Sequence, residues 1–434
     1  MRCCNDGSTA PRPNPGTLVL TALLIGLTAC AAQDAADGPA IPTGTYELEA
    51  SMDGQAFPVR LELIDAGDRP WGRLTVVAGQ ERVVAVRGTG VDEDGVWRFA
   101  AGGPVHGLEL RVADPVSGTL LLGGAPPIPL EGTRAGELGD ADAEALRAHH
   151  VLDPIGLAAR AGEEGASFAT GLPDGTLIFA RHGPDLSRQT LMIAEPARAP
   201  GAGSGGGGDG WDEPRIMSVS GEYSDRSPFV LPDGSGLIFA SDRPVDVDDD
   251  GGDEFEGYRL WFTPRTGQDG WGSPSPVRFD GGWEHDARQP SITADGTLYF
   301  SSNAPGGSGE GDIYAAAPAA PGRWSTPRNL GEPINGPGDE NGAFVAPDGS
   351  YMILTSAGER PGRTGGDDLY VSRRTDDGWS EPMPLDLPVN TYANEYGPWV
   401  STADGALYFT SDRYGYAAIF RLDAEQAGLP TPAR

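Results

Sequence analysis

Alternating apolar and polar residues mark the first folded part of the chain, residues 44–135. In the segment FPVRLELI, Val59, Leu61 and Leu63 fall on one face, and Arg60 and Glu62 fall on the other. Successive side chains of a strand point to opposite faces, so this period of two indicates half-buried β-strands. Turn-forming stretches such as DEDG and DPVSG separate about eight such runs, which predicts an antiparallel β-sandwich or a small β-barrel. A barrel of this size either holds a ligand or is filled by its own side chains, and we expect a filled one.

A different pattern, a repeated unit, occupies residues 156–425. An Asp-Gly pair followed by an apolar run recurs at Asp174, Asp233, Asp295, Asp348 and Asp404. A second apolar run such as DIYAAA or DLYVSR follows each pair, and four units contain a Trp with a Pro three residues later. Four short strands per unit at a regular period predict the blades of a β-propeller. The chain is therefore expected to be all-β, with five blades, or six if the inserts hide a degenerate unit.

Residues outside the two β-rich parts complete the domain plan. The segment GDADAEALRAHH (139–150) has helical character, and Asp140 is expected to cap it. Residues 136–155 are therefore assigned to a helical connector and residues 426–434 to a C-terminal tail. The last unit lacks its Trp-containing strand, and we expect a strand from residues 151–165 to complete that blade and close the ring.

The repeated unit resembles the WD40-like propeller repeat of exported bacterial proteins, which also forms the TolB propeller. The resemblance rests on ADGTLYFSSN with DIYAA, on PDGSYMILTS with DLYVSRR, and on LPVNTYANEYGPWVSTADGALYFTSDR, and it covers residues 165–425. It implies a propeller and leaves the function open, because propellers serve both as binding modules and as enzymes. The first unit departs from the pattern, with ARHG where other units have SDR or SSN.

The N-terminus resembles a bacterial lipoprotein signal peptide. The apolar run 17–29 is too short to span a bilayer as a helix and is followed at once by Cys30, in the sequence LTAC. The resemblance implies removal of residues 1–29, a lipid anchor on Cys30 and a flexible tether over residues 30–43. Ala31, which follows the cysteine, favours the outer membrane, with the protein facing the periplasm or the surface. An ordinary signal peptide is the alternative.

Charge and cysteine content narrow the classes of function. The 434 residues include 63 Asp and Glu against 31 Lys and Arg, a formal net charge of −32. Such a charge repels phosphates, so nucleic acid is not an expected partner. After removal of residues 1–29 only Cys30 remains, which excludes disulfides and thiolate zinc sites in the mature chain.

Candidate binding residues lie in the loops that share one face of the predicted propeller. Aromatic side chains with polar tips are typical of peptide or sugar contacts. The candidates are Trp283, His285, Tyr392, Tyr396, Tyr414 and Tyr416, together with Arg243 and Arg413. Acidic residues that recur in the same loops, such as Glu340 and Glu395, are expected to join the blades. The functional alternative is a ring of acids that attracts a cation or a basic peptide.

The insert DVDDDGGDEFEG resembles the first half of a calcium-binding loop. Asp246, Asp248 and Asp250 alternate as in that motif, and Asp253 and Glu254 could add ligands, but the twelfth position is Gly257 instead of Glu. Either Ca²⁺ binds here or the loop is simply acidic and solvated.

Three functions follow from these patterns. The first is a non-catalytic, lipid-anchored envelope protein whose propeller binds a protein or peptide. The second is a carbohydrate-active or other hydrolytic propeller that uses two unequal carboxylates near the channel mouth. The third is a calcium-stabilised scaffold. Motifs for a serine nucleophile elbow, a zinc protease helix or a dinucleotide fold are absent from the sequence.

Overall fold

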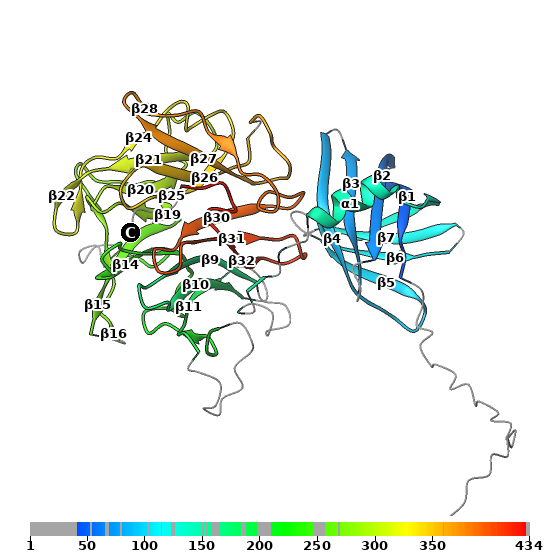
Figure 1. Ribbon diagram of the computed structural model, residues 1–434, viewed down its shortest axis with the longest axis horizontal. Helices are drawn as coiled ribbons and strands as arrows, with labels where there is room; N and C mark the ends of the chain where they lie inside the picture. Colours follow the sequence, from blue (N-terminus) through cyan, green and yellow to red (C-terminus); the bar gives the residue numbers. More distant parts are fainter. Residues whose placement is uncertain are drawn as a thin grey trace, which may run out of the picture. The chain divides into compact units, whose positions relative to one another are not determined.

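The structure is a computed structural model that describes most of residues 41–430. The residues in this range that it does not describe are 53, 66–68, 79, 102–104, 114, 123–125, 150–151, 153, 156, 158–164, 184–187, 198–209, 246–256, 268–269 and 359. The described chain is almost entirely β, as the sequence predicts, and folds into an N-terminal barrel and a C-terminal propeller (Figure 1).

Eight antiparallel strands form the barrel, each paired with the next, and β1 pairs with β8 to close it. The strands are β1 (Gly44–Met52), β2 (Gln55–Asp65), β3 (Pro70–Ala78), β4 (Gln80–Val91), β5 (Val96–Ala101), β6 (Val105–Arg111), β7 (Val116–Leu122) and β8 (Ile128–Gly136). Inward residues such as Tyr46, Leu61, Leu74 and Leu110 are fully buried in one hydrophobic cluster. The barrel is therefore closed and packed with its own side chains, which decides between the sandwich and the barrel.

One helix, α1 (Asp140–Ala148), follows the barrel. Its buried residues Ala143 and Leu146 pack on Ile64 and Trp71 of the outer barrel surface. The expected cap is wrong: Gly139 occupies the N-cap position and makes no side-chain cap, so Asp140 already belongs to the first turn. There its negative charge still favours the helix N-terminus.

The propeller strands form six sheets, the alternative count that the sequence allows. Five sheets contain the recurring unit, and their innermost strands contact one another in a closed circle, in the order β9, β13, β19, β25, β30 and back to β9. The sixth sheet is small and joins β18 (Arg278–Phe279) to the hairpin of β22 (Pro318–Ala320) and β23 (Arg323–Trp324).

Each of the five unit sheets runs outward from its innermost strand. The sheets are β9 (Ala166–Gly171), β10 (Leu177–His182), β11 (Gln189–Ala194) and β12 (Arg215–Ile216); β13 (Asp225–Val230), β14 (Gly236–Ser241), β15 (Arg259–Thr266), β16 (Gly270–Trp271) and β17 (Ser275–Pro276); β19 (Arg288–Ile292), β20 (Leu298–Ser302), β21 (Asp312–Ala316) and β24 (Arg328–Asn329); β25 (Glu340–Val345), β26 (Tyr351–Ser356), β27 (Asp368–Thr375), β28 (Gly378–Trp379) and β29 (Met383–Pro384); and β30 (Glu395–Val400), β31 (Ala406–Ser411) and β32 (Ala418–Asp423).

The Asp-Gly pairs form the turn between the first and second strands of each unit. Every turn glycine has positive φ, from 70° at Gly234 to 87° at Gly175, a conformation that favours glycine. The preceding aspartate accepts a hydrogen bond from the backbone two residues on, as from Thr297 N to Asp295 Oδ1 at 3.0 Å. The recurring phrase is therefore an Asx turn that sets the strand register.

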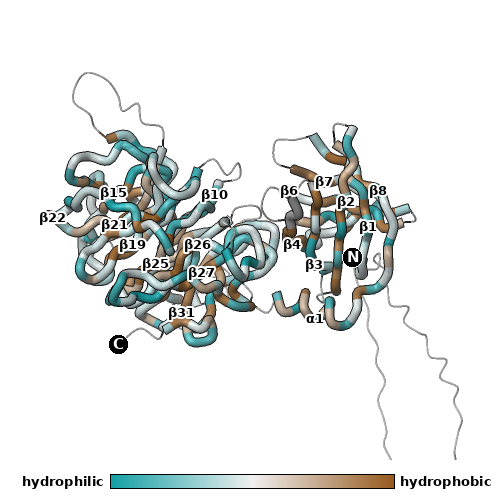
Figure 2. The backbone as a smooth tube through the Cα atoms, turned by 90° about the horizontal axis from the view of Figure 1, so that it is seen from above, coloured by the Kyte–Doolittle hydropathy of each residue, from teal (hydrophilic) through white to brown (hydrophobic). Residues whose placement is uncertain are grey.

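A segment that precedes the first unit contacts the last unit, at the place where the sequence predicts a closing strand. Pro154 forms a β-bridge with Phe420 on β32, and Ile155 N donates to Ile419 O at 2.9 Å. A single β-bridge and one backbone hydrogen bond therefore join residues that precede the first unit to β32, and the last sheet has three strands among the described residues. Hydrophobic residues gather on the strands and hydrophilic ones on the loops (Figure 2).

Among the described helices, none has the length and apolar character needed to cross a membrane.

Candidate functional site

The centre of the propeller is lined by one equivalent residue from each innermost strand. Phe168, Ser227, Gln289, Gly342 and Gly397 have φ between 50° and 59°, and each lies where its strand slips register against the next strand. Three of the five are not glycine, although left-handed backbone costs other residues free energy. Strain that recurs at one level of a channel points to a functional constraint there.

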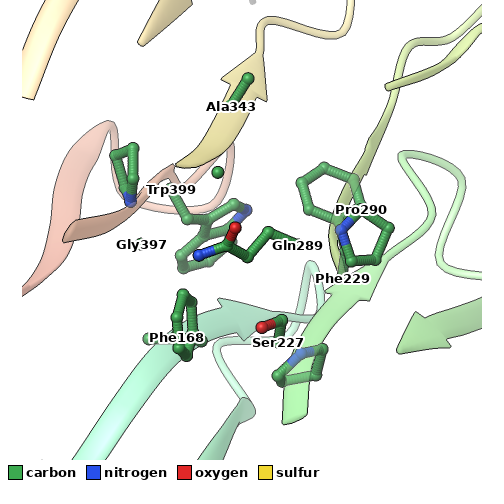
Figure 3. A pocket seen from close by; sticks show the side chains of 12 residues that line it. Phe168, Ser227, Phe229, Gln289, Pro290, Ala343, Gly397 and Trp399 are labelled. Atoms are coloured by element: carbon green, nitrogen blue, oxygen red, sulfur yellow. The ribbon is translucent and has the colours of Figure 1, made fainter. Parts of the chain in front are cut away.

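Side chains from three blades enter a cavity of about 30 Å³ at this level. Phe168, Ser227 and Gln289 point toward one another in it (Figure 3). A volume of this size holds about two waters. The two glycines make room for these side chains, because a Cβ on Gly397 would lie 2.6 Å from the Phe168 ring and a Cβ on Gly342 would lie 3.3 Å from Gln289.

Two polar groups in this ring lack hydrogen-bond partners among the described residues. They are the hydroxyl of Ser227, a residue only 3% exposed, and Oε1 of Gln289. Buried polar atoms are normally satisfied by protein, water or ligand. The ring therefore offers polar groups to whatever occupies the channel.

We expect Ser227→Gly to raise the free energy of unfolding by about 1 kcal/mol, because glycine adopts positive φ without strain. Urea denaturation measures this change. The matched control is Ser235→Gly, at an exposed turn with ordinary backbone, which should not stabilise the protein. A destabilised Ser227→Gly variant would contradict the assignment of strain.

Carboxylates gather at the channel mouth, where Asp367 directly precedes β27 and Asp412 directly follows β31. Asn394 holds two of these loops together: its Oδ1 accepts from Asp367 N at 3.1 Å, and its Nδ2 donates to Asp412 Oδ2 at 2.7 Å. The carboxylate of Asp367 receives no hydrogen bond from any described residue. Burial and repulsion from Asp412, Asp339 and Asp368 raise the pKa of Asp367 to about 6, and the charge of Arg363 opposes this shift.

Tyr396 and Arg226 complete this mouth of the channel. Tyr396 directly precedes the ring glycine Gly397 and packs on Phe168, with ring centroids 5.4 Å apart. Burial, followed by the charges of Asp412 and Asp367, raises the pKa of the Tyr396 hydroxyl, and Arg226 opposes this shift. Arg226 lies over the Tyr258 ring at 4.0 Å, and its Nε has no partner among the described residues.

A serine–histidine pair lies at the same end of the first unit. Ser167 Oγ and His182 Nε2 are 2.7 Å apart. Burial, aided by Arg226, lowers the pKa of His182 to about 4, so the imidazole is neutral at pH 7. Although this resembles a nucleophile and its base, Ser167 is fully buried. The pair therefore secures β10 to β9.

Arg243 and Arg413, predicted to bind a ligand, instead hold the blades together. Arg413 is fully buried and donates to Ser411 Oγ, to Pro388 O and Val389 O, and to Glu395 Oε1 at 3.3 Å. Burial raises the pKa of Glu395, and the charge of Arg413 opposes it. The guanidinium groups of Arg243 and Arg413 are thus both engaged within the fold.

The same arrangement recurs in two more units. Arg243 donates to Asp225, Ser241 and the carbonyl of Val219. In the fourth unit Arg360 contacts Glu340, Ser356 and the carbonyls of Pro333 and Ile334. We name this acid–serine–arginine set the blade clamp. It agrees with the expectation that the recurring acids join the blades, at Glu340 and Glu395.

The aromatic candidates do not form one contact face. Trp283 packs on Phe300 and Tyr314 in the propeller core, and His285 meets its edge. Tyr416 also packs partly buried against that core. Only Tyr396 reaches the channel mouth.

Two further tyrosines contact the barrel and connector. Tyr392 stacks on His149 at 3.8 Å, and its hydroxyl accepts from Arg73 on β3 at 2.9 Å. Tyr414 is buried, lies under Arg87 of β4 and donates to Leu152 O. Spacing alone did not reveal these partners, because they lie more than 200 residues away in the sequence.

The remaining predicted sites lie outside the described residues. These are Cys30 and the calcium loop with Asp246, Asp248, Asp250, Asp253 and Glu254. Within the described part of the chain, no group of three or more His, Cys, Asp or Glu side chains is arranged to hold a metal ion.

Comparisons with known proteins find similar folds only among solved structures. No protein family profile matches the chain, and no curated protein sequence matches it. An α-L-arabinanase of Penicillium chrysogenum, solved with arabinobiose, is 12% identical over 73% of this chain and 93% of its own, with a TM-score of 0.37. The GH93 α-L-arabinofuranosidase of Fusarium graminearum is 12% identical over 64% and 98%, with a TM-score of 0.37. A puromycin-hydrolyzing peptidase of Mycobacterium tuberculosis is 16% identical over 87% of this chain, with a TM-score of 0.32, and the chain spans 53% of that protein.

Proposed function

We propose that the propeller is a binding module of the cell envelope that receives a positively charged group of a protein or peptide partner at the channel mouth. The observation that carries this proposal is Asp367, a carboxylate with no hydrogen-bond donor among the described residues and three other aspartates near it. An ammonium or guanidinium group placed beside it would relieve that repulsion.

The strained ring below the mouth supports the same proposal. Equivalent positions of a repeat normally carry equal residues, but this level has Phe168, Ser227 and Gln289 beside two glycines. Unequal groups are what an asymmetric ligand requires. The unpaired Ser227 hydroxyl and Gln289 carbonyl would bond to the chain that carries the cation.

Binding of a basic peptide should weaken as Asp367 takes up a proton. Its pKa of about 6 means that the carboxylate is mostly charged at pH 7.5 and mostly neutral at pH 5. We expect the affinity for a tetralysine amide, measured by titration calorimetry, to fall by about tenfold for each pH unit below 6.

Two controls accompany this titration. A tetraglutamate peptide should not bind, and Asp376→Asn, on an exposed hairpin of the same unit, should leave the affinity unchanged. Affinity for tetralysine that is equal at pH 5 and pH 7.5, or equal in the two peptides, would refute the site.

The envelope location rests on the LTAC segment and Cys30. Lipidation there would tether the propeller to a membrane through residues 31–43. Metabolic labelling with a fatty-acid analogue should mark the wild-type protein and leave Cys30→Ala unlabelled; label on both would remove the anchor from the proposal.

Hydrolysis is the second candidate, and one observation favours it. The Asn394 side chain binds the backbone N–H of Asp367 and the carboxylate of Asp412. The two carboxylates repel each other but differ in environment, since only that of Asp412 accepts hydrogen bonds from Asn394. Two unequal carboxylates suit a general acid and its partner. Turnover of nitrophenyl glycosides that disappears in both Asp367→Asn and Asp412→Asn would establish this candidate over simple binding.

A further inference from the structure

A second, larger cavity lies between the third and fourth units, on the face formed by the Asp-Gly turns. Its volume is about 690 Å³, within the range of small-molecule sites. The turns at Asp295 and Asp348 form part of its wall, and Tyr299 and Trp379 supply aromatic surface. This face is opposite the channel mouth, because each innermost strand runs from the mouth to its Asp-Gly turn.

Two arginines line this cavity without an acidic partner. Neither Arg328 nor Arg374 lies within 4.0 Å of a carboxylate among the described residues, although the chain carries 63 acidic residues. Both act on the same group: burial raises the pKa of the Tyr299 hydroxyl and Asp295 adds to that shift, whereas Arg374 and Arg328 counteract it. Both guanidinium groups therefore act on Tyr299, and they balance the carboxylates of Asp295 and Asp348 in the same cavity wall.

The tryptophan at this cavity differs from those of the first and third units. Trp211 and Trp324 donate their indole N–H to the carbonyls of Gly175 and Gly296 in their own Asp-Gly turns, at 3.0 and 2.9 Å. The buried indole N–H of Trp379 has no acceptor among the described residues. Its ring instead faces the Tyr299 ring edge-on at 6.5 Å and carries Arg374 at 5.0 Å. The Trp379 indole N–H therefore makes no turn contact at the place where the cavity opens.

Hydroxyl-binding groups surround the aromatic pair. Asp295 and Asp348 use Oδ1 for their turns, which leaves the second carboxylate oxygen outside the turn bonds. Ser325 and Thr326 contribute hydroxyls to the lining. Aromatic rings, carboxylates and hydroxyls together are the groups that bind the faces and hydroxyls of a sugar ring.

We propose that this cavity binds an anionic sugar, with Arg328 and Arg374 on the acid group and Tyr299 and Trp379 against the ring. Arginine forks match the planar geometry of a carboxylate and also bind phosphate. The acid group is therefore either the carboxylate of a uronic acid or a sugar phosphate. The site is independent of the channel mouth and of the charge of Asp367.

Titration calorimetry with galacturonate, glucose 6-phosphate, galactose and inorganic phosphate tests this site. We expect at least one of the two acidic sugars to bind at least tenfold more tightly than galactose and than inorganic phosphate. Arg374→Gln and Arg328→Gln should each weaken that binding at least tenfold. The matched control is Arg373→Gln, the exposed neighbour of Arg374 that does not line the cavity.

Each outcome decides one point. Preference for galacturonate or for glucose 6-phosphate tells which acid group is recognised, and an unchanged affinity in Asp367→Asn separates this site from the channel mouth. Equal affinity for inorganic phosphate and the acidic sugars would overturn a sugar site. The assignment to this cavity would be overturned if no sugar showed saturable binding up to 10 mM, roughly the weakest useful affinity for such a site. It would also be overturned if Arg373→Gln alone lost binding.

Discussion

Replacing Arg413 with methionine is expected to lower the free energy of unfolding by about 3–5 kcal/mol, the largest stability effect of any single change considered. The guanidinium of Arg413 and the carboxylate of Glu395 are both fully buried and face each other at 3.3 Å. Methionine would leave Glu395 as an unpaired buried charge, and two loop carbonyls, those of Pro388 and Val389, would lose their donor. Urea denaturation at pH 7.5 measures the loss.

The matched control is Arg421→Met in the same unit. Arg421 also pairs with a carboxylate, Asp404 at 3.0 Å, but about a third of its side chain is exposed. A surface pair of this kind contributes at most about 1 kcal/mol. Similar losses in the two variants would contradict the blade clamp as a buried device. The double variant Glu395→Gln with Arg413→Met should recover part of the loss, since no charge is then left unpaired.

The architecture is readable from the sequence because its determinants are local and repeated. An Asp-Gly pair specifies its turn within four residues, and the period-two pattern of the barrel specifies which face of each strand is buried. Both signals act along short stretches of chain. The contact of Pro154 and Ile155 with β32 was also predictable, since the last unit visibly lacks a strand.

The roles of individual loop residues were not readable in this way. Arg360 belongs to the blade clamp, yet its unit reads SAGER where the second and fifth units read SDR, so the shifted arginine hides the equivalence. Tyr392 and Tyr414 have the character of exposed binding aromatics, but Arg73 and Arg87 of the barrel cover them. These partners depend on tertiary contacts between distant segments, which no local pattern contains.

The channel site was missed for a related reason. Ser227 and Gln289 are unremarkable in the sequence, and only the backbone shows that they share positive φ with two glycines at equivalent positions. An aligned reading of the five innermost strands would have found the signal, since Phe168, Ser227 and Gln289 stand where Gly342 and Gly397 stand. Asp367 was hidden beside Asp368, a strand residue whose carboxylate is satisfied by backbone donors.

Asp367→Asn is expected to stabilise the protein at pH 7.5 while it weakens binding of a basic peptide at least tenfold. The folded-state pKa of about 6 lies above the ordinary value for aspartate, so between about pH 4 and pH 6 the folded chain holds this proton more tightly than the unfolded chain. The free energy of unfolding therefore falls as the pH rises through that range, and the destabilisation by ionised Asp367 is fully present above pH 6. Allowing for solvent near the mouth, we expect asparagine to recover about 1–2 kcal/mol at pH 7.5.

The pH dependence makes this prediction specific to Asp367. At pH 5 the wild-type carboxylate is largely protonated, so the advantage of asparagine should shrink to roughly half of its value at pH 7.5. Urea denaturation at the two pH values measures it, and Asp376→Asn, an exposed neighbour in the same unit, should show no such change. A binding site accounts for a residue that lowers the stability of the folded protein but is needed to bind a cation at the mouth. If asparagine instead destabilises the protein at pH 7.5, Asp367 serves the fold, and the channel mouth loses its strongest argument for a ligand.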